Sequence, residues 1–189
     1  MIAQAPSDSY QAPQSGKSAL HKFGDKEEVK ISDILKGKVT LQVVHTPGHD
    51  QDHCCFLFKE EGRLFTGDHV LGQGTSVFND LGDYMRSLKK CSDLLDTEAK
   101  RSGTADKEVL LYPAHGPTIE NGKAMLKQYY AHRLERENQV LDLLGKAPPT
   151  SGETKAWTIN QITAKLYASY PEMVWPQAAR GLFRHLHKL

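Results

Sequence analysis

The alternation of apolar and polar residues along the chain predicts a mixture of strands and helices. Short apolar runs at residues 39–44, 63–66 and 109–112 are typical of buried β-strands. Two longer segments place apolar residues three or four positions apart, which predicts helices that each bury one face. The first of these stripes is Leu81, Met85, Leu88, Cys91 and Leu95, and the second is Leu126, Tyr130, Leu134, Leu141 and Leu144.

Polar segments separate the predicted elements. Residues 96–107 carry no apolar stripe, so we expect a loop between the two helices. Asn121 precedes the second helix and Gly145 follows it, and both residue types are common at helix ends. Residues 148–152 read Pro-Pro-Thr-Ser-Gly and predict a linker, because proline fixes φ and the segment has no apolar face.

A small helical module is predicted after this linker. Thr158 and Gln161 fit a capping box at the start of a helix, whose inward positions are Ile159, Ile162 and Leu166. A second helix is expected to begin at Trp175-Pro176, since proline is favoured in the first helical turn. Its apolar side is Ala179, Leu182, Phe183 and Leu186. The spacing is typical of a helix-turn-helix unit.

Composition adds little to this picture. The 189 residues are 39% hydrophobic and 25% charged, as in an ordinary globular protein, and suggest no membrane span. The formal net charge is +1, so the charge of the whole chain favours no particular partner. Any nucleic-acid surface must therefore be local.

The cysteines and the N-terminal segment bear on the compartment. Cys54, Cys55 and Cys91 form an odd set that matches no disulfide or metal motif, which favours a reducing compartment. Residues 1–20 are rich in Gln, Ser, Pro and Ala and predict a disordered tail without the Arg-rich pattern of a transit peptide. We expect an intracellular protein, in the cytoplasm or the mitochondrial matrix.

Three short motifs follow the three predicted strands, and each ends in or contains a side chain that can bind a metal ion. They are Thr46-Pro47-Gly48-His49, Thr66-Gly67-Asp68 and Tyr112-Pro113-Ala114-His115-Gly116. Ligand sites in layered α/β proteins collect at the carboxyl ends of strands, where these motifs are expected to lie. Neutral imidazole and carboxylate are both zinc ligands. The three motifs together indicate a site for two metal ions.

The order and spacing of these motifs resemble the third, fourth and fifth metal-ligand motifs of the metallo-β-lactamase superfamily. Residues 46–83 and 112–133 further resemble the lactamase-β-like branch, which includes mitochondrial single-strand endoribonucleases and fungal acyl-carrier-protein thioesterases. The resemblance covers roughly residues 20–189. It implies that His49 binds one Zn²⁺ ion, that His115 binds the other, and that Asp68 bridges both.

The sequence departs from the pattern of the superfamily in two places. The first motif of the family, His-x-His-x-Asp-His, supplies four more ligands and does not occur in this chain, whose only His-x-His pair is His185 with His187. Each ion would have two protein ligands here, against three in typical catalytic zinc sites, which predicts weak or partial binding. Ala114 stands where the family more often has glycine, at some cost if the turn needs a positive φ.

The resemblance also implies a fold and a division into domains. The fold class is α/β (α+β), with the C-terminal half of an αββα metallo-β-lactamase sandwich followed by a truncated winged-helix-like module. The expected parts are a tail at 1–20, a partial metallo-β-lactamase domain at 21–147, a linker at 148–156 and the module at 157–189. A sheet face that lacks its partner half would be exposed, which predicts a homodimer or aggregation.

The last predicted helix carries Arg180, Arg184, His185 and Lys188 at spacings that suggest a basic stripe. Such a stripe is compatible with nucleic-acid contact but is more often a solvated helix face. Four other histidines have structural explanations at least as good as metal binding, and we expect them to lie outside the site. They are His45, His53, His69 and His132.

Two hypotheses about function follow. The first is a metal-dependent hydrolase that attacks either the phosphodiesters of single-stranded RNA or an acyl thioester, two substrate classes that the motifs do not distinguish. The second is a non-catalytic pseudoenzyme or interaction fragment, which the absence of the first motif favours. The fold alone decides nothing between them, because one fold hosts many chemistries.

Overall fold

The computed structural model describes residues 24–31, 39–101, 109–149 and 156–189, so the predicted tail at 1–20 lies outside the described residues. One five-stranded sheet has the order β1-β2-β3-β4-β5. Its strands are β1 (Glu28–Ile31), β2 (Val39–His45), β3 (Cys54–Phe58), β4 (Arg63–Gly67) and β5 (Leu111–Pro113). The helices are α1 (Leu81–Arg101), α2 (Gly122–Leu144), α3 (Ile159–Leu166), the 3₁₀ turn η1 (Glu172–Val174) and α4 (Trp175–Lys188).

Strand direction determines where the predicted motifs meet. Strands β1 to β4 form an antiparallel meander, and β5 pairs parallel to β4. Strands β2, β4 and β5 therefore run in the same direction and end at the same edge of the sheet. The three predicted strands are confirmed, with ends that differ by one or two residues.

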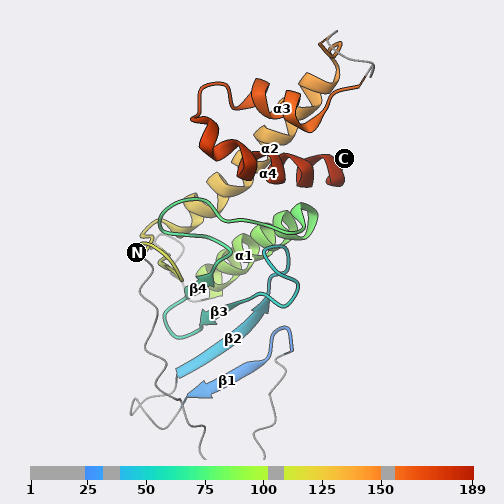
Figure 1. Cartoon of the computed structure of the whole chain (residues 1–189). Helices are drawn as coiled ribbons and strands as arrows, with labels where there is room; N and C mark the ends of the chain where they lie inside the picture. Colours follow the sequence, from blue (N-terminus) through green and yellow to red (C-terminus); the bar gives the residue numbers. More distant parts are fainter. Residues whose placement is uncertain (1–23, 32–38, 102–108, 150–155) are drawn as a thin grey trace, which may run out of the picture.

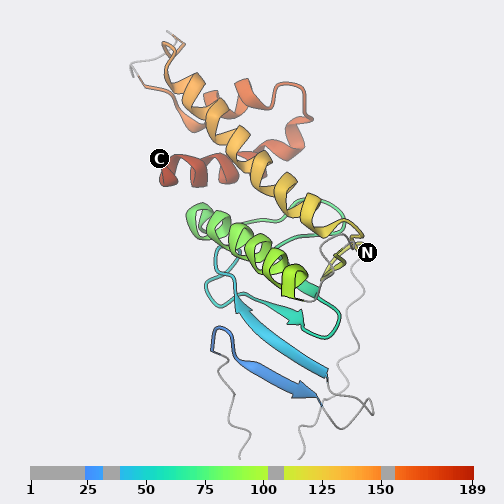
Figure 2. The ribbon, with the colours of Figure 1, turned by 180° about the vertical axis from the view of Figure 1, so that it is seen from behind.

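Helix α1 covers one face of the sheet, as Figures 1 and 2 show from opposite sides. Its predicted stripe is confirmed, because every member is buried in one core with the strand residues Cys55, Leu57 and Leu64. The alternation of a strand places Phe58 and Phe65 on the opposite face. Phe65 is 40% exposed and stacks on Tyr112 at a ring distance of 5.1 Å.

The predicted loop at 96–107 is wrong in its first half, because α1 continues to Arg101. The segment is polar yet helical: Ala99 is buried, while Asp96 pairs with Lys123 of α2 at 2.8 Å. A second pair joins Glu98 and Arg101 one turn apart. Charged residues that pair along and between helices stabilise a helix end that shows no apolar stripe. Residues 102–107 lie outside the described part of the chain.

Helix α2 begins and ends where its flanking residues predicted. The Asn121 side chain accepts a hydrogen bond from the backbone N–H of Ala124, and Gly145 closes the last turn. Its predicted buried stripe is wrong beyond Leu126. The four other members are 37–47% exposed: Tyr130, Leu134, Leu141 and Leu144. The buried face instead contains Leu126, Arg133, Glu137, Val140 and Leu143.

A second core joins the end of α2 to the helices that follow. It is built from Val140, Leu143, Ile162 and Leu182, with Trp157 and Leu166 packed against it. The predicted capping box is confirmed, since Thr158 and Gln161 exchange both of its hydrogen bonds. Phe183 was predicted to face inward and is 54% exposed.

The prediction that the basic residues of α4 form one solvent-exposed stripe is wrong. His185 is 2% exposed and lies edge-on to Phe78 at 6.1 Å. The Lys188 ammonium donates to both carboxylate oxygens of the buried Glu137, at 2.8 and 2.7 Å. Arg180 and Arg184 keep the predicted character, because within the described part of the chain neither forms an ion pair with a carboxylate, whereas Lys188 does.

Gly48 allows α1 to approach the motif that follows β2. Its φ is 128°, and a Cβ atom there would lie 2.3 Å from the backbone nitrogen of Tyr84. We expect Gly48→Ala to lower the free energy of unfolding by roughly 2–4 kcal/mol, from backbone strain and overpacking together. Urea unfolding followed by circular dichroism measures the change.

The matched control is Gly62→Ala. Gly62 also has a positive φ, 63°, but nothing lies within 4 Å of an added Cβ. It should cost about 1–2 kcal/mol, from the backbone conformation alone. Equal losses in the two variants would contradict the role assigned to the contact with Tyr84.

Burial of His185 predicts a pH dependence of stability. Burial, and then the positive charge of its neighbours, lowers the pKa of His185 from 6.5 to about 4. Between pH 6.5 and pH 4 the imidazole of His185 is protonated in the unfolded chain but stays neutral in the folded chain. Its contribution to the free energy of unfolding is therefore complete above pH 6.5 and is lost as the pH falls toward 4. The charged or titratable groups around the ring are Arg133, Arg136 and His132 on α2 and Lys188 on α4.

We expect the titration of His185 to lower the free energy of unfolding by roughly 3 kcal/mol between pH 6.5 and pH 4. Urea unfolding of the wild type and of His185→Gln across that range isolates the contribution, because the variant has no titrating group at this position. A pH dependence that is the same in both proteins would rule it out.

Candidate metal centre

The shared edge of β2, β4 and β5 brings the three predicted metal-binding residues together. His49 follows β2, Asp68 follows β4 and His115 follows β5. The Nε2 atom of His49 lies 3.8 Å from Oδ2 of Asp68, and Nε2 of His115 lies 3.3 Å from Oδ1. Each oxygen of the single carboxylate thus faces a different imidazole.

Three hydrogen bonds to segment 75–79 hold the His49 turn. Nδ1 of His49 bonds to the carbonyl oxygen of Val77 at 2.8 Å, which leaves Nε2 facing Asp68. The side-chain amide of Asn79 donates to the His49 carbonyl oxygen, and its backbone N–H donates to the Gly48 carbonyl oxygen. A ring held at Nδ1 has a fixed orientation and a fixed tautomer when Nε2 serves as a ligand.

Asp68 is held through its backbone, and its carboxylate is left available. The Ser76 hydroxyl donates to the Asp68 carbonyl oxygen at 2.5 Å. Within the described structure, Oδ1 of Asp68 is buried and has no hydrogen-bond partner. A buried carboxylate oxygen without a donor is costly, so this atom requires an explanation.

The His115 turn is positioned by backbone contacts. The Ala114 N–H donates to the Gly67 carbonyl oxygen, and the Gly72 N–H donates to the His115 carbonyl oxygen. Positive φ falls on Gly116, at 86°, and not on Ala114. The departure from glycine at position 114 therefore costs no backbone strain here.

Two of the histidines that we expected to lie elsewhere are close to this site. The rings of His49 and His53 are 5.7 Å apart, and the rings of His53 and His69 are 5.8 Å apart. Burial, and then His49, lowers the pKa of His53, whose Nδ1 is hydrogen-bonded to the Thr46 hydroxyl. Burial lowers the pKa of His69 to about 3, so this ring is neutral at physiological pH.

The other two excluded histidines lie away from the site. The ring of His45 bonds to the carbonyl oxygen of Gln51. His132 lies on α2 beside Arg133, and burial and this arginine lower its pKa. Across the described ranges, no group of three or more His, Cys, Asp or Glu side chains is arranged to hold one ion. The site therefore offers pairs of candidate ligands.

Sequence reasoning missed Arg133, which fixes segment 75–79 from the side opposite the metal-binding residues. Its guanidinium donates to the Thr75 hydroxyl and to the Ser76 carbonyl oxygen, both at 2.9 Å, and lies 4.9 Å above the Phe78 ring. Arg133 is only 8% exposed. Arg133 lies seven residues, or two helical turns, after Leu126, and this spacing was the sequence signal that it shares the buried face of the helix.

The comparisons with known proteins agree with the fold and the motifs. The chain matches the metallo-beta-lactamase superfamily over residues 2–115 and the beta-lactamase-associated winged helix domain over residues 158–189. The chain belongs to the metallo-beta-lactamase superfamily. Its fold is accordingly α/β, with a mixed sheet and a helical module of winged-helix type.

Two relatives of known name are similar to this chain over most of its length. The chain is 38% identical over 149 residues to the Beta-lactamase-like protein 2 homolog of Drosophila melanogaster, covering 79% of this chain and 45% of that protein. It is 34% identical over 168 residues to the Atrochrysone carboxyl ACP thioesterase of Aspergillus chevalieri, covering 86% of this chain and 50% of that protein. The chain spans about half the length of these relatives.

A solved structure is similar in fold. A beta-lactamase domain protein from Burkholderia ambifaria superimposes with a TM-score of 0.61 at 23% identity, covering 91% of this chain and 47% of that one. This likeness shows the similarity of the fold alone. Among the described helices, none has the length and apolar character needed to cross a membrane.

Proposed function

We propose that this chain carries half of a metal-dependent hydrolase site for acyl thioesters, in which Asp68 bridges two ions. The observation that supports the bridge is the placement of the two Asp68 oxygens, one toward His49 and one toward His115. Each oxygen of this one carboxylate faces a different imidazole nitrogen, at 3.8 and 3.3 Å, which is the arrangement that a carboxylate shared by two ions requires.

The donor set fits zinc. Two ligand atoms bound to one tetrahedral zinc ion at ordinary bond lengths lie roughly 3.3–3.6 Å apart. The two imidazole–carboxylate separations, 3.3 and 3.8 Å, are close to that spacing. Oδ1 of Asp68 is buried and accepts no hydrogen bond in the described structure, which the role of a metal ligand would explain. We expect weak or partial binding to this chain alone, because each ion would have only two protein ligands here.

The residues of this chain would hold the two zinc ions in position. The ions would supply the activation of water and of the substrate carbonyl group. Bound zinc lowers the pKa of water and polarises a carbonyl group. His49, fixed by the Val77 carbonyl oxygen, holds one position, and the turn that contains Ala114 and Gly116 places His115 at the other. His53 lies beside His49, with a ring distance of 5.7 Å, and burial lowers its pKa.

The acyl thioester is the substrate class that the relatives favour. A relative that shares 34% of its aligned residues with this chain is named an acyl-carrier-protein thioesterase. Hydrolysis of single-stranded RNA is the second candidate from the sequence, and no contact in the structure favours it over the thioester. A non-catalytic role is the alternative if the ligands of the first motif are never supplied.

The decisive experiment uses a full-length form that contains a His-x-His-x-Asp-His segment. We expect zinc-dependent cleavage of an acyl-carrier-protein thioester, measured beside a single-stranded RNA. Asp68→Ala should lower kcat/KM at least about a hundred-fold and more than His49→Ala or His115→Ala, because the carboxylate touches both positions. Metal analysis of the same samples should show both ions disturbed in Asp68→Ala and mainly one in each histidine variant.

Asp50→Ala is the matched control. Its carboxylate also lies near Nε2 of His49, at 3.7 Å, but its side chain is 59% exposed and its Oδ1 atom accepts a hydrogen bond from Asn79. It should keep nearly full activity. If Asp68→Ala turns over the substrate nearly as fast as the wild type, the bridging role of Asp68 is refuted. Cleavage of RNA alone would refute the thioester as substrate class. Cleavage of neither substrate would favour the pseudoenzyme hypothesis.

We also propose that the chain on its own self-associates through the sheet face that α1 does not cover. Phe65 and Tyr112 present a stacked aromatic pair there, and Phe65 is 40% exposed. Sedimentation of the 189-residue chain should show dimers or larger species, and Phe65→Lys should shift them toward monomer. A wild-type chain that sediments as a compact monomer would disprove this proposal.

A further inference from the structure

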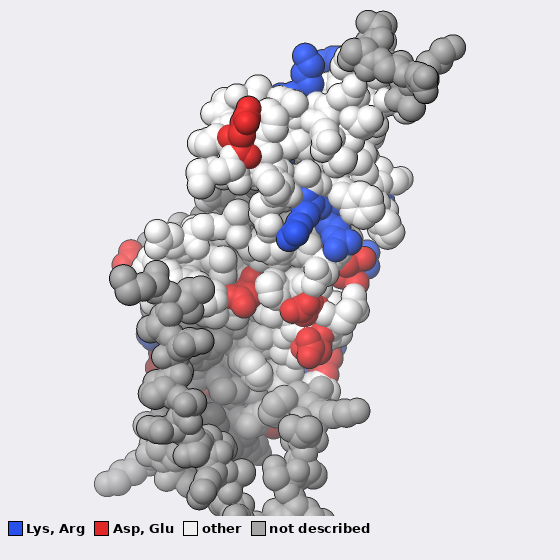
Figure 3. All heavy atoms as spheres, viewed as in Figure 1, with Lys and Arg blue, Asp and Glu red and all other residues white. Residues whose placement is uncertain are grey.

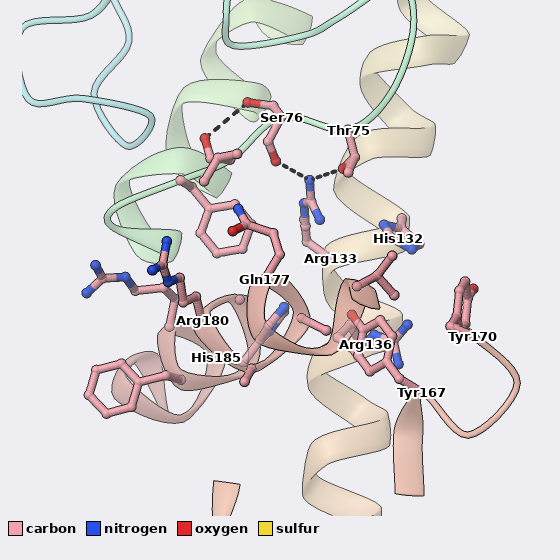
Figure 4. A pocket seen from close by; sticks show the side chains of 18 of the residues that line it. Thr75, Ser76, His132, Arg133, Arg136, Tyr167, Tyr170, Gln177, Arg180 and His185 are labelled. Atoms are coloured by element: carbon pink, nitrogen blue, oxygen red, sulfur yellow. Dashed lines mark hydrogen bonds between the residues drawn. The ribbon is translucent and has the colours of Figure 1, made fainter. Parts of the chain in front are cut away.

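A pocket of about 1080 Å³ lies between segment 75–79, helix α2 and the C-terminal module. Figure 4 shows its lining side chains converging from α2 on one side and from α4 on the other, with Thr75 and Ser76 above. Its volume is at the upper end of the range for small-molecule sites. The three candidate metal ligands, His49, Asp68 and His115, do not line it.

One short segment separates this pocket from the candidate metal centre. Val77 lines the pocket, while its carbonyl oxygen holds Nδ1 of His49. Ser76 also lines the pocket, while its hydroxyl holds the backbone of Asp68. A molecule in the pocket would therefore lie next to the residues that orient both metal positions.

The pocket is mainly apolar, with aromatic walls. Phe78, Tyr167 and Phe183 contribute rings, and Met173 and Ile159 contribute aliphatic surface. The guanidinium of Arg136 lies 4.4 Å from the centre of the Tyr167 ring. Arginine and tyrosine faces of this kind stack on flat aromatic groups.

Gly181 leaves room in this pocket at a cost to α4. A glycine inside a helix destabilises it by about 1 kcal/mol relative to alanine. Its φ is not positive, and nothing lies within 4 Å of an added Cβ, so neither backbone conformation nor close packing requires glycine here. The space that it leaves is part of the pocket.

The charged groups of the pocket all have the same sign. Arg133, Arg136, Arg180 and Arg184 line it, and none of the described lining residues is acidic. In the view of Figure 3, basic side chains gather along the lower edge of α4, with acidic side chains below them toward the sheet. Such a pocket attracts an anion.

Two buried polar atoms at the pocket lack a partner within the described structure. They are Nε of Arg133 and Nδ1 of His185, on side chains that are 8% and 2% exposed. Both residues line the pocket, and Figure 4 shows them extending into the space between α2 and α4. Unpaired buried polar atoms of this kind require an explanation, and a bound water or ligand is one.

We propose that this pocket binds a flat aromatic anion, at a site that segment 75–79 separates from the candidate metal centre. Aromatic walls and stacked arginine match a planar ring system, and four arginines match acidic substituents on it. The mainly apolar lining distinguishes this pocket from a single-stranded RNA surface, because nucleic-acid interfaces are more polar.

The test measures binding of naphthalene-2-carboxylate and of its neutral amide to the metal-free 189-residue chain by calorimetry. We expect the carboxylate to bind more tightly than the amide. Gly181→Phe should weaken binding at least about ten-fold, equivalent to ~1.4 kcal/mol, and Gly181→Ala should have a smaller effect. Arg136→Met should weaken binding of the carboxylate more than binding of the amide.

Asn138→Phe is the control for added bulk, because Asn138 is exposed on α2 and does not line the pocket. Thermal unfolding of every variant checks the fold, and Gly181→Phe should not destabilise α4, since phenylalanine favours a helix more than glycine does. Unchanged affinity in Gly181→Phe, or equal affinity for acid and amide, would overturn the proposal. Binding of an oligouridylate that Gly181→Phe abolishes, without binding of the carboxylate, would also overturn it and indicate a nucleic-acid surface.

Discussion

The contacts of segment 75–79 with two different parts of the molecule are the constraint on which the site depends. On one side Val77 and Ser76 hold His49 and the backbone of Asp68. On the other side Arg133 of α2 holds Thr75 and Ser76. Because α2 also carries Val140 and Leu143 into the second core, the position of the helical module is coupled to the geometry of the candidate metal centre.

The predictable part of the site was the part that strand direction determines. His49, Asp68 and His115 each follow a short apolar run, and runs that end at the same sheet edge bring their following residues together. Helix ends were equally accessible, since Asn121 and the Thr158–Gln161 pair satisfy backbone groups in a way that depends only on local sequence. The helix ends depend only on neighbouring residues in the sequence. The meeting of the three ligands depends only on the order and direction of the strands.

The unpredictable part was the burial of charge on α2 and α4. Pattern reasoning assigns apolar residues to the core, so it selected Tyr130 and Leu134, which are exposed, and passed over Arg133. A buried arginine is stable only where carbonyl, hydroxyl and aromatic groups meet it, and these come from residues about 57 positions earlier in the chain. No local pattern contains that information. The same applies to His185, whose burial depends on Phe78.

Buried polar groups at the junction of the two cores have consequences for function. Glu137 is paired with Lys188, but Nε of Arg133 and Nδ1 of His185 remain without partners in the described structure. A well-packed apolar contact would hold the two parts together at lower cost, since buried polar groups stabilise poorly unless every one of them is satisfied. Gly181 adds a further cost on the same surface, because it weakens α4 without relieving any crowding. Sites where sequence and structure depart from the most stable solution are commonly functional. We conclude that this junction is shaped to hold a ligand beside the metal-binding edge as well as to join two cores.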